Sequence, residues 1–123
     1  MRDDRVAPFV RTINNIHVVE ESRHTAFARD EVRQRLAAAG RTRRAVDALI
    51  VAIVSYFIVM SMVNPKVYEN AGLDPERAAR EARDNEHYKA MLRSSCSGLM
   101  DFLAEVGLLT KPAMRIYKRA NLI

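Results

Sequence analysis

NNIHVVEESRHTAFARDE, residues 14–31, gathers two histidines and several acids among apolar residues in one unbroken run. Apolar side chains recur at helical spacing before and through this run, from Phe9 to Phe27. Pro8 stands near the start, where a helix tolerates proline, and Gly40 is a natural C-cap. The pattern predicts one long helix from about Arg5 to Ala39.

The rest of the chain also predicts helices. The 123 residues include only four glycines, four prolines and no tryptophan, which leaves little room for a turn-rich β fold. We expect an apolar helix with Thr42 as N-cap, an interior at 45–63 and a stop at Asn64-Pro65. A polar helix then starts at Asp74-Pro75, and a short basic helix follows Thr110 and Pro112. Between them, a helix at 97–109 meets Gly107 and carries four apolar residues on one side: Leu99, Phe102, Leu103 and Val106. We therefore predict an all-α protein.

The uncharged run 48–63 has two interpretations. As a helix it spans about 24 Å, at about 1.5 Å per residue, whereas a bilayer core requires about 30 Å. Asp47 also interrupts its start. We therefore expect a helix that is buried on all sides of a bundle, and a membrane association is not favoured. The alternative is a small single-span membrane protein whose basic residues 41–44 stay on the cytoplasmic side.

Charge and cysteine content favour a cytoplasmic protein that does not bind nucleic acid. The net charge is +5, but most arginines alternate with acids, which is typical of solvated helix faces. The one concentrated basic cluster, residues 40–44, is expected to be a surface turn. The single cysteine, Cys96, excludes an internal disulfide and fits a reducing compartment. The N-terminal residues lack the apolar core of a signal peptide.

The polar residues of the opening stretch fall on one face of its predicted helix. At about 100° per residue, Glu21 lies about 40° to one side of His17 and His24 about 20° to the other. Glu20 lies at the edge of this arc, at about 60°, and Glu31 points the same way two turns later. Imidazole nitrogens and a carboxylate oxygen are ligands for iron, manganese or zinc. The face therefore predicts a row of metal ligands; the alternative is an incidental polar face that is solvated or paired with Arg23 and Arg29.

The spacing narrows the kind of metal site. Zinc metalloproteases use His-Glu-x-x-His, with histidines four residues apart, whereas these histidines are seven apart. Residues 21–24 instead form an E-x-x-H motif, which ferritin-like di-iron bundles use twice, together with single glutamates from two other helices. Alone this motif is weak. The additional histidine one turn upstream gives H-x-x-x-E-x-x-H, which is far more restrictive.

The segment IHVVEESRHTAFARDEV, residues 16–32, resembles the last metal-binding helix of the p-aminobenzoate N-oxygenase family, a ferritin-like di-iron group. The resemblance implies that His17, Glu21 and His24 are iron ligands and that Glu20 and Arg23 complete the motif beside them without binding the metal. It also implies two irons, dioxygen and a small-molecule substrate, best known as an arylamine that becomes a nitro compound. The similarity continues less specifically through the apolar helix and the GLDPERA turn.

The sequence departs from this family in what precedes the motif. Sixteen residues stand before His17 and none is a glutamate, whereas the family's other ligands lie on helices before this one. The resemblance therefore implies that residues 1–123 form a single partial domain, the C-terminal part of a ferritin-like bundle. A second copy or a complementary chain would complete the site, and a homodimer would combine four histidines and two glutamates. The alternative is a truncated, non-catalytic helical module for oligomerisation or interaction.

Overall fold

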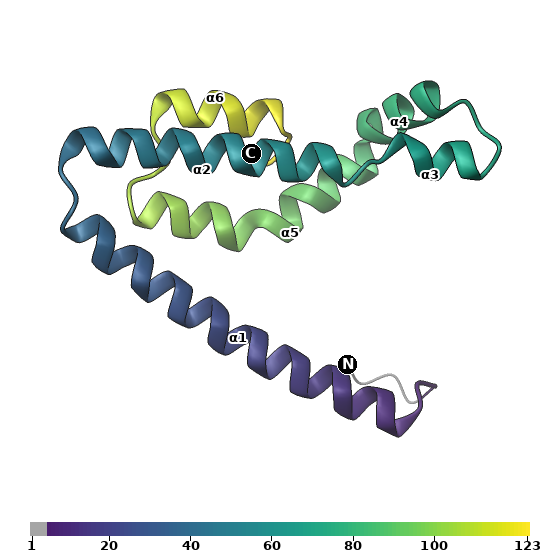
Figure 1. Cartoon of the computed structure of the whole chain (residues 1–123), viewed down its shortest axis with the longest axis horizontal. Coiled ribbons are helices and arrows are strands. Elements are labelled where there is room, and N and C mark those ends of the chain that lie inside the picture. Colours follow the sequence, from purple (N-terminus) through teal and green to yellow (C-terminus); the bar gives the residue numbers. More distant parts are fainter. Residues whose placement is uncertain (1–4) are drawn as a thin grey trace. The chain divides into compact units, whose positions relative to one another are not determined.

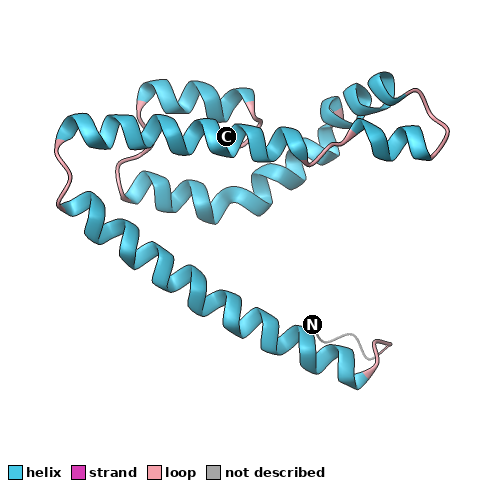
Figure 2. Cartoon of the chain, in the orientation of Figure 1, coloured by secondary structure: helices cyan, strands magenta, loops and turns pink. Residues whose placement is uncertain are grey.

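The computed structural model describes residues 5–123, and every regular element in them is a helix (Figures 1 and 2). In chain order these are α1 (Pro8–Ala37), α2 (Arg41–Ser61), α3 (Pro65–Asn70), α4 (Pro75–Asp84), α5 (Glu86–Glu105) and α6 (Lys111–Arg119). The predicted all-α fold is confirmed. The chain divides into two compact units, the first ending at Ala39 and the second comprising Gly40–Ile123. The prediction of a single partial domain stays a prediction.

Side-chain caps with a proline in the following turn fix the starts of three helices in the second unit. The Oδ1 atom of Asp74 accepts a hydrogen bond from the Arg77 amide at 2.8 Å, and Thr110 accepts one from the Ala113 amide at 3.4 Å. Asn64 does the same for the Lys66 amide at 3.0 Å. Each cap satisfies an amide that has no partner inside its helix, and a proline follows in the first turn. The predicted caps at Asp74 and Thr110 are confirmed.

The junction of α1 and α2 differs from the prediction. Helix α1 is closed by Ala38 in a right-handed helical conformation, and not by Gly40. Gly40 has extended backbone angles and is the N-cap of α2, so the predicted N-cap Thr42 lies inside the first turn of that helix. Glycine is acceptable at an N-cap as well as at a C-cap, and the sequence pattern did not distinguish the two roles.

Asn85 divides the polar helix that the sequence predicts from Asp74-Pro75 through the stretch up to residue 95. Its ψ angle of 121° ends α4, and its side chain accepts a hydrogen bond from the Tyr88 amide at 3.1 Å, which starts α5. The predicted separate helix from residue 97 is therefore the second half of α5. The short helix α3 was not predicted, although Asn64-Pro65 is an N-cap followed by proline at the first helical position.

The core of the second unit forms where α6 packs against α2. Ala48 and Ala52 of α2 and Ala113, Tyr117 and Ala120 in or next to α6 are all completely buried. Small side chains on both helices let their backbones approach closely, and the Tyr117 ring fills the space that remains. Buried α5 residues, among them Phe102 and Leu103, complete this core.

Within the unit Gly40–Ile123 the opposite side of α2 is exposed, so the prediction of a helix buried on all sides is wrong for this unit. Ile50 is 53% exposed and Phe57 is 65% exposed, because neighbouring helices cover only the side that bears Ala48 and Ala52. Leu99 of α5 is likewise 42% exposed, although the sequence placed it on the same apolar side as the buried Phe102. Helical periodicity identified apolar faces but not which of them another helix covers.

The segment Arg41–Asn70 is the one stretch in the described residues long and apolar enough to cross a membrane by length and composition alone, and core helices of soluble proteins also meet this test. In the structure α6 packs along α2 with four exposed cations: Lys111, Arg115, Lys118 and Arg119. A membrane span by α2 with α6 in place would carry these charges into hydrocarbon, at a cost of about 3 kcal/mol each. The packing therefore disfavours the single-span alternative.

Candidate metal centre

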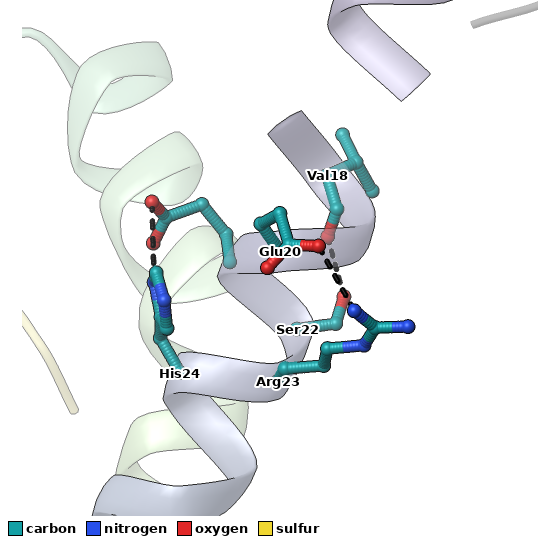
Figure 3. A network of polar contacts seen from close by, with 6 residues as sticks. Val18, Glu20, Ser22, Arg23 and His24 are labelled. Atoms are coloured by element: carbon teal, nitrogen blue, oxygen red, sulfur yellow. Dashed lines mark hydrogen bonds and ion pairs between the residues drawn. The ribbon is translucent and has the colours of Figure 1, made fainter. Parts of the chain in front are cut away.

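Helix α1 provides a long, regular scaffold for the predicted ligands. It runs for 30 residues with proline in its first turn. The Ser22 hydroxyl donates to the Val18 carbonyl at 2.7 Å, so this polar side chain is satisfied within the helix (Figure 3). The helix has no break between His17 and His24, and their side chains therefore keep the arc expected from helical geometry.

Glu21 and His24 lie next to each other on this face. The Nδ1 atom of His24 is 3.8 Å from Oε1 of Glu21, and their side chains are 70% and 57% exposed, respectively (Figure 3). This distance is longer than a hydrogen bond, so the imidazole and the carboxylate are close without being locked together. Exposed side chains on one helix face can turn toward a ligand that approaches from outside the helix.

His17 joins Glu21 along a shallow depression of about 450 Å³ on the surface of α1. Its lining consists of His17, Val18, Glu21, Ser22, Thr25, Ala26 and Arg29. His24 does not line this depression. Among residues 5–123 no three His, Cys, Asp or Glu side chains converge into a group that could hold a metal ion. The structure thus places the candidate ligands in two neighbouring pairs along the helix, His17 with Glu21 and Glu21 with His24.

Glu20 and Arg23 form a separate pair at the edge of the row. The Nη1 atom of Arg23 is 2.9 Å from Oε1 of Glu20. Figure 3 shows Arg23 extending away from His24. The ion pair engages the Glu20 carboxylate with Arg23, whereas the Glu21 carboxylate lies next to His24. The role of this pair beside a metal stays a prediction.

Glu31, two turns beyond the row, also has a cationic partner. Its Oε1 atom is 2.7 Å from Nε of Arg35, which lies one turn further along α1. The carboxylate is 40% exposed and the guanidinium 78% exposed, so this is a solvated i,i+4 pair. Glu31 therefore does not extend the set of candidate ligands.

The donor chemistry of the row fits iron, but the number of donors does not complete a site. Two imidazoles and one carboxylate are common ligands of non-haem iron. Di-iron carboxylate sites collect their ligands from several facing helices, and bridging carboxylates are among them. One face of α1 can therefore supply one side of such a site.

Comparison with known families gives a match that includes helix α1. The model of a family described as p-aminobenzoate N-oxygenase AurF matches residues 1–107. The chain belongs to this family. The resemblance seen in residues 16–32 is thereby confirmed, and the AurF family is a di-iron oxygenase family that uses a small-molecule substrate and dioxygen. No curated protein and no solved structure matched the sequence.

The AurF family match includes α1 to α5 and ends before α6, which begins at Lys111. The sequence predicted a short basic helix there, but not that three of its cations share one face. The signal was present in the spacing of Lys111, Arg115 and Lys118 at i, i+4 and i+7.

Proposed function

We propose that this chain supplies one ligand-bearing helix to the di-iron centre of an oxygenase that oxidises an arylamine or a similar small amine with dioxygen. The observation that carries this proposal is the row His17, Glu21 and His24 on one face of α1, inside the region matched by the AurF family. The family match supports the class of reaction. The specific substrate comes from the family resemblance alone.

Each residue of the row has a separate task in this proposal. His17 and His24 bind iron through a ring nitrogen, and Glu21 binds through its carboxylate. Bound iron would supply the activation of dioxygen. Arg23 keeps the Glu20 carboxylate at the edge of the face through their 2.9 Å ion pair. Ile13, one turn before His17, is one of the apolar residues that would exclude water from this face once another helix covers it.

The remaining ligands come from another copy of this chain or from a complementary chain. Three donors on one helix cannot enclose two metal ions, and a homodimer would contribute four histidines and two glutamates. The exposure of the Glu21 and His24 side chains, 57% and 70%, leaves this face accessible to a second helix. We place the assembled protein in the cytoplasm on the basis of its single cysteine.

The adjacent glutamates of α1 provide a matched test. Protein purified aerobically from iron-supplemented cells is analysed for iron content and for assembled mass. We expect bound iron in an oligomer, with Glu21→Gln losing most of the metal and Glu20→Gln retaining it. Both substitutions remove one exposed carboxylate from the same helix, so a difference between them reports ligation. Equal iron content in the two variants would contradict the proposal.

The reaction is tested on the iron-loaded assembly with an arylamine, dioxygen and a chemical reductant. We expect oxygenated amine products by mass spectrometry, with label from ¹⁸O₂, and no such products from Glu21→Gln. If the protein binds iron but oxygenates none of the tested arylamines, the proposed metal site stands and the proposed substrate class is rejected.

A second candidate function is a non-catalytic assembly module. The specific observation in its favour is the outward face of α2, where Val46, Ile50, Val54 and Phe57 are each 47% to 65% exposed. A face of this kind favours association with another protein surface. A stable oligomer that contains no iron and forms equally well with Glu21→Gln would support this candidate over the oxygenase.

A further inference from the structure

The positive charge of this protein is concentrated in two of its helices. Helices α2 and α6 contain seven arginines and lysines and one acid, Asp47, which gives them a net charge of +6. The complete chain has 20 basic and 15 acidic residues and a net charge of +5. All other residues together therefore have 13 basic and 14 acidic side chains. The excess belongs to the α2–α6 pair, which is packed together in the second unit.

Most of this charge lies on the outer face of α6. Relative to Lys111, Arg115 and Lys118 lie within an arc of about 60°, and Arg119 lies just beside it. All four side chains are exposed, whereas the inner residues Ala113 and Tyr117 are completely buried against the core. Within residues 5–123 no ion pair joins these four cations to an acid. We call these four residues the α6 basic face.

An apolar hollow adjoins this face. It has a volume of about 280 Å³ and is lined by Ile53, Tyr56 and Phe57 of α2 together with Ile116 and Arg119 of α6. Arg119 thus belongs both to the α6 basic face and to the rim of the hollow. A partner with carboxylates and one apolar side chain would match both features, because the acids can pair with the cations while the side chain enters the hollow.

The proposed oxidation requires a partner that supplies electrons. Conversion of an arylamine to its hydroxylamine forms an N–O bond and breaks the O–O bond of dioxygen, and the second oxygen leaves as water. The balance requires two electrons and two protons in addition to dioxygen and the amine. A carrier that delivers one electron at a time must therefore dock twice in each cycle and leave quickly, which favours electrostatic attraction between exposed charges over a large buried interface.

We propose that the α6 basic face and the adjoining hollow dock an acidic one-electron carrier protein that reduces the oxygenase. This inference rests on the proposed function. The AurF family match ends at residue 107, before α6, so it includes the α2 residues of the hollow but not the four cations of the α6 basic face. An anionic membrane or a nucleic acid would also be attracted by four cations. The concave hollow favours a protein, because neither a bilayer surface nor a duplex offers a single protruding apolar side chain to fill it.

The test measures binding of the full chain to an acidic [2Fe–2S] ferredoxin by isothermal titration calorimetry at low and high salt. We expect the double variant Arg115→Gln/Arg119→Gln to bind roughly tenfold more weakly at low salt, and the affinity of the unaltered protein to fall as salt rises. The matched control is Arg80→Gln/Arg93→Gln, which removes the same charge from exposed positions on α4 and α5. A second double variant, Lys111→Gln/Lys118→Gln, is expected to repeat the loss, and circular dichroism checks that all variants keep their helices.

Equal affinity of the α6 variants and the control, or affinity that does not change with salt, would overturn the proposal. Tighter binding to phosphatidylserine-containing vesicles or to duplex DNA than to ferredoxin would also overturn it, in favour of a membrane or nucleic-acid surface. The titration needs no iron in the chain. A chain that binds no iron would therefore refute the proposed oxygenase without changing the binding result. An iron-loaded protein that does not bind ferredoxin would refute the docking surface alone.

Discussion

His24 presents Nδ1 to the Glu21 carboxylate across a single turn of α1, with 3.8 Å between the nitrogen and Oε1. The E-x-x-H spacing produces this relationship, because residues i and i+3 are neighbours on a helix surface. The two groups are too far apart for a hydrogen bond and close enough for both to turn toward one ion. His17 lies one turn earlier on the same face, and the three donors therefore form a row and not an enclosed cage.

The first prediction concerns His24. Because His24 is one of only three donors on this face, His24→Ala is expected to remove most of the iron from the assembled protein, measured by elemental analysis. His87→Ala is the matched control, since His87 is also an exposed histidine but lies in the first turn of α5, outside the row. Iron content that stays unchanged in His24→Ala, or that falls equally in both variants, would show that the row does not bind the metal.

The placement of the three candidate ligands on one helix face was predictable from the sequence because it depends on one continuous helix. The relative directions of His17, Glu21 and His24 follow from helical rotation, and no residue between them interrupts α1. The caps at Asp74 and Thr110 were predictable for a similar reason, since each requires only a short polar side chain and the next few residues.

Properties that depend on contacts between helices were not predictable in this way. The apolar residues of α2 indicate a helix that needs cover, but Ala52 is buried and its neighbour Ile53 is 44% exposed only because of where the other helices pack. Asn85 divides α4 from α5 through a cap that competes with a continuous helix, and the sequence alone does not decide this competition. Convergence of ligands from different helices belongs to the same class, which is why a complete site could not be derived from α1.

The second prediction tests the close packing of α2 with the rest of its unit. Ala52 is completely buried, and therefore Ala52→Leu must force neighbouring side chains apart. We expect a loss of about 1–3 kcal/mol in the free energy of unfolding, measured by urea denaturation. Ala45→Leu adds the same side chain at an exposed position of α2 and is expected to change stability by less than about 0.5 kcal/mol. Equal destabilisation by the two substitutions would mean that this side of α2 is not closely packed.

The third prediction concerns the end of α5. Gly107 has a φ angle of 75°, and the amides of Gly107 and Leu108 donate to the carbonyls of Ala104 and Leu103. The guanidinium of Arg44 also donates to the carbonyl of Val106, at 3.0 Å, so this turn is held from two sides. A side chain at residue 107 would be strained in this left-handed conformation, and we expect Gly107→Ala to cost about 1–2 kcal/mol in thermal or urea unfolding.

Gly40→Ala is the control for this substitution. Gly40 has a φ angle of −70°, and no atom lies within 4 Å of the position of an added Cβ. The reduced entropy of the unfolded chain offsets the weaker N-cap, so the expected change in unfolding free energy is only a few tenths of a kcal/mol, to order of magnitude. A smaller cost at Gly107 than at Gly40 would contradict the left-handed turn at the end of α5.

The last prediction concerns Tyr117 and the dependence of stability on pH. The Tyr117 hydroxyl is buried without a hydrogen-bond partner among the described residues. Burial raises the pKa of Tyr117 above its ordinary value of 10.0. The nearby Ser55 hydroxyl lowers this pKa and so offsets part of the increase. Ser55 donates its own proton to the Val51 carbonyl. The folded protein therefore keeps the phenolic proton at a pH where the unfolded chain has lost it. The contribution of Tyr117 protonation to the free energy of unfolding is fully present below pH 10.0, and it is lost as pH rises from there through the folded pKa.

Tyr117→Phe removes both the unpaired hydroxyl and this titration. At neutral pH we expect the variant to equal or exceed the unaltered protein in unfolding free energy by up to about 1 kcal/mol, because an unpaired buried polar group is lost while the ring remains. Above pH 10.0 the difference in favour of the variant should widen, since all other tyrosines are the same in both proteins. Denaturant unfolding at neutral and alkaline pH measures both effects. A variant that is less stable than the unaltered protein at neutral pH would show that the hydroxyl has a hydrogen-bond partner. A stability difference that does not change with pH would show that the hydroxyl has the same pKa in the folded and unfolded chain.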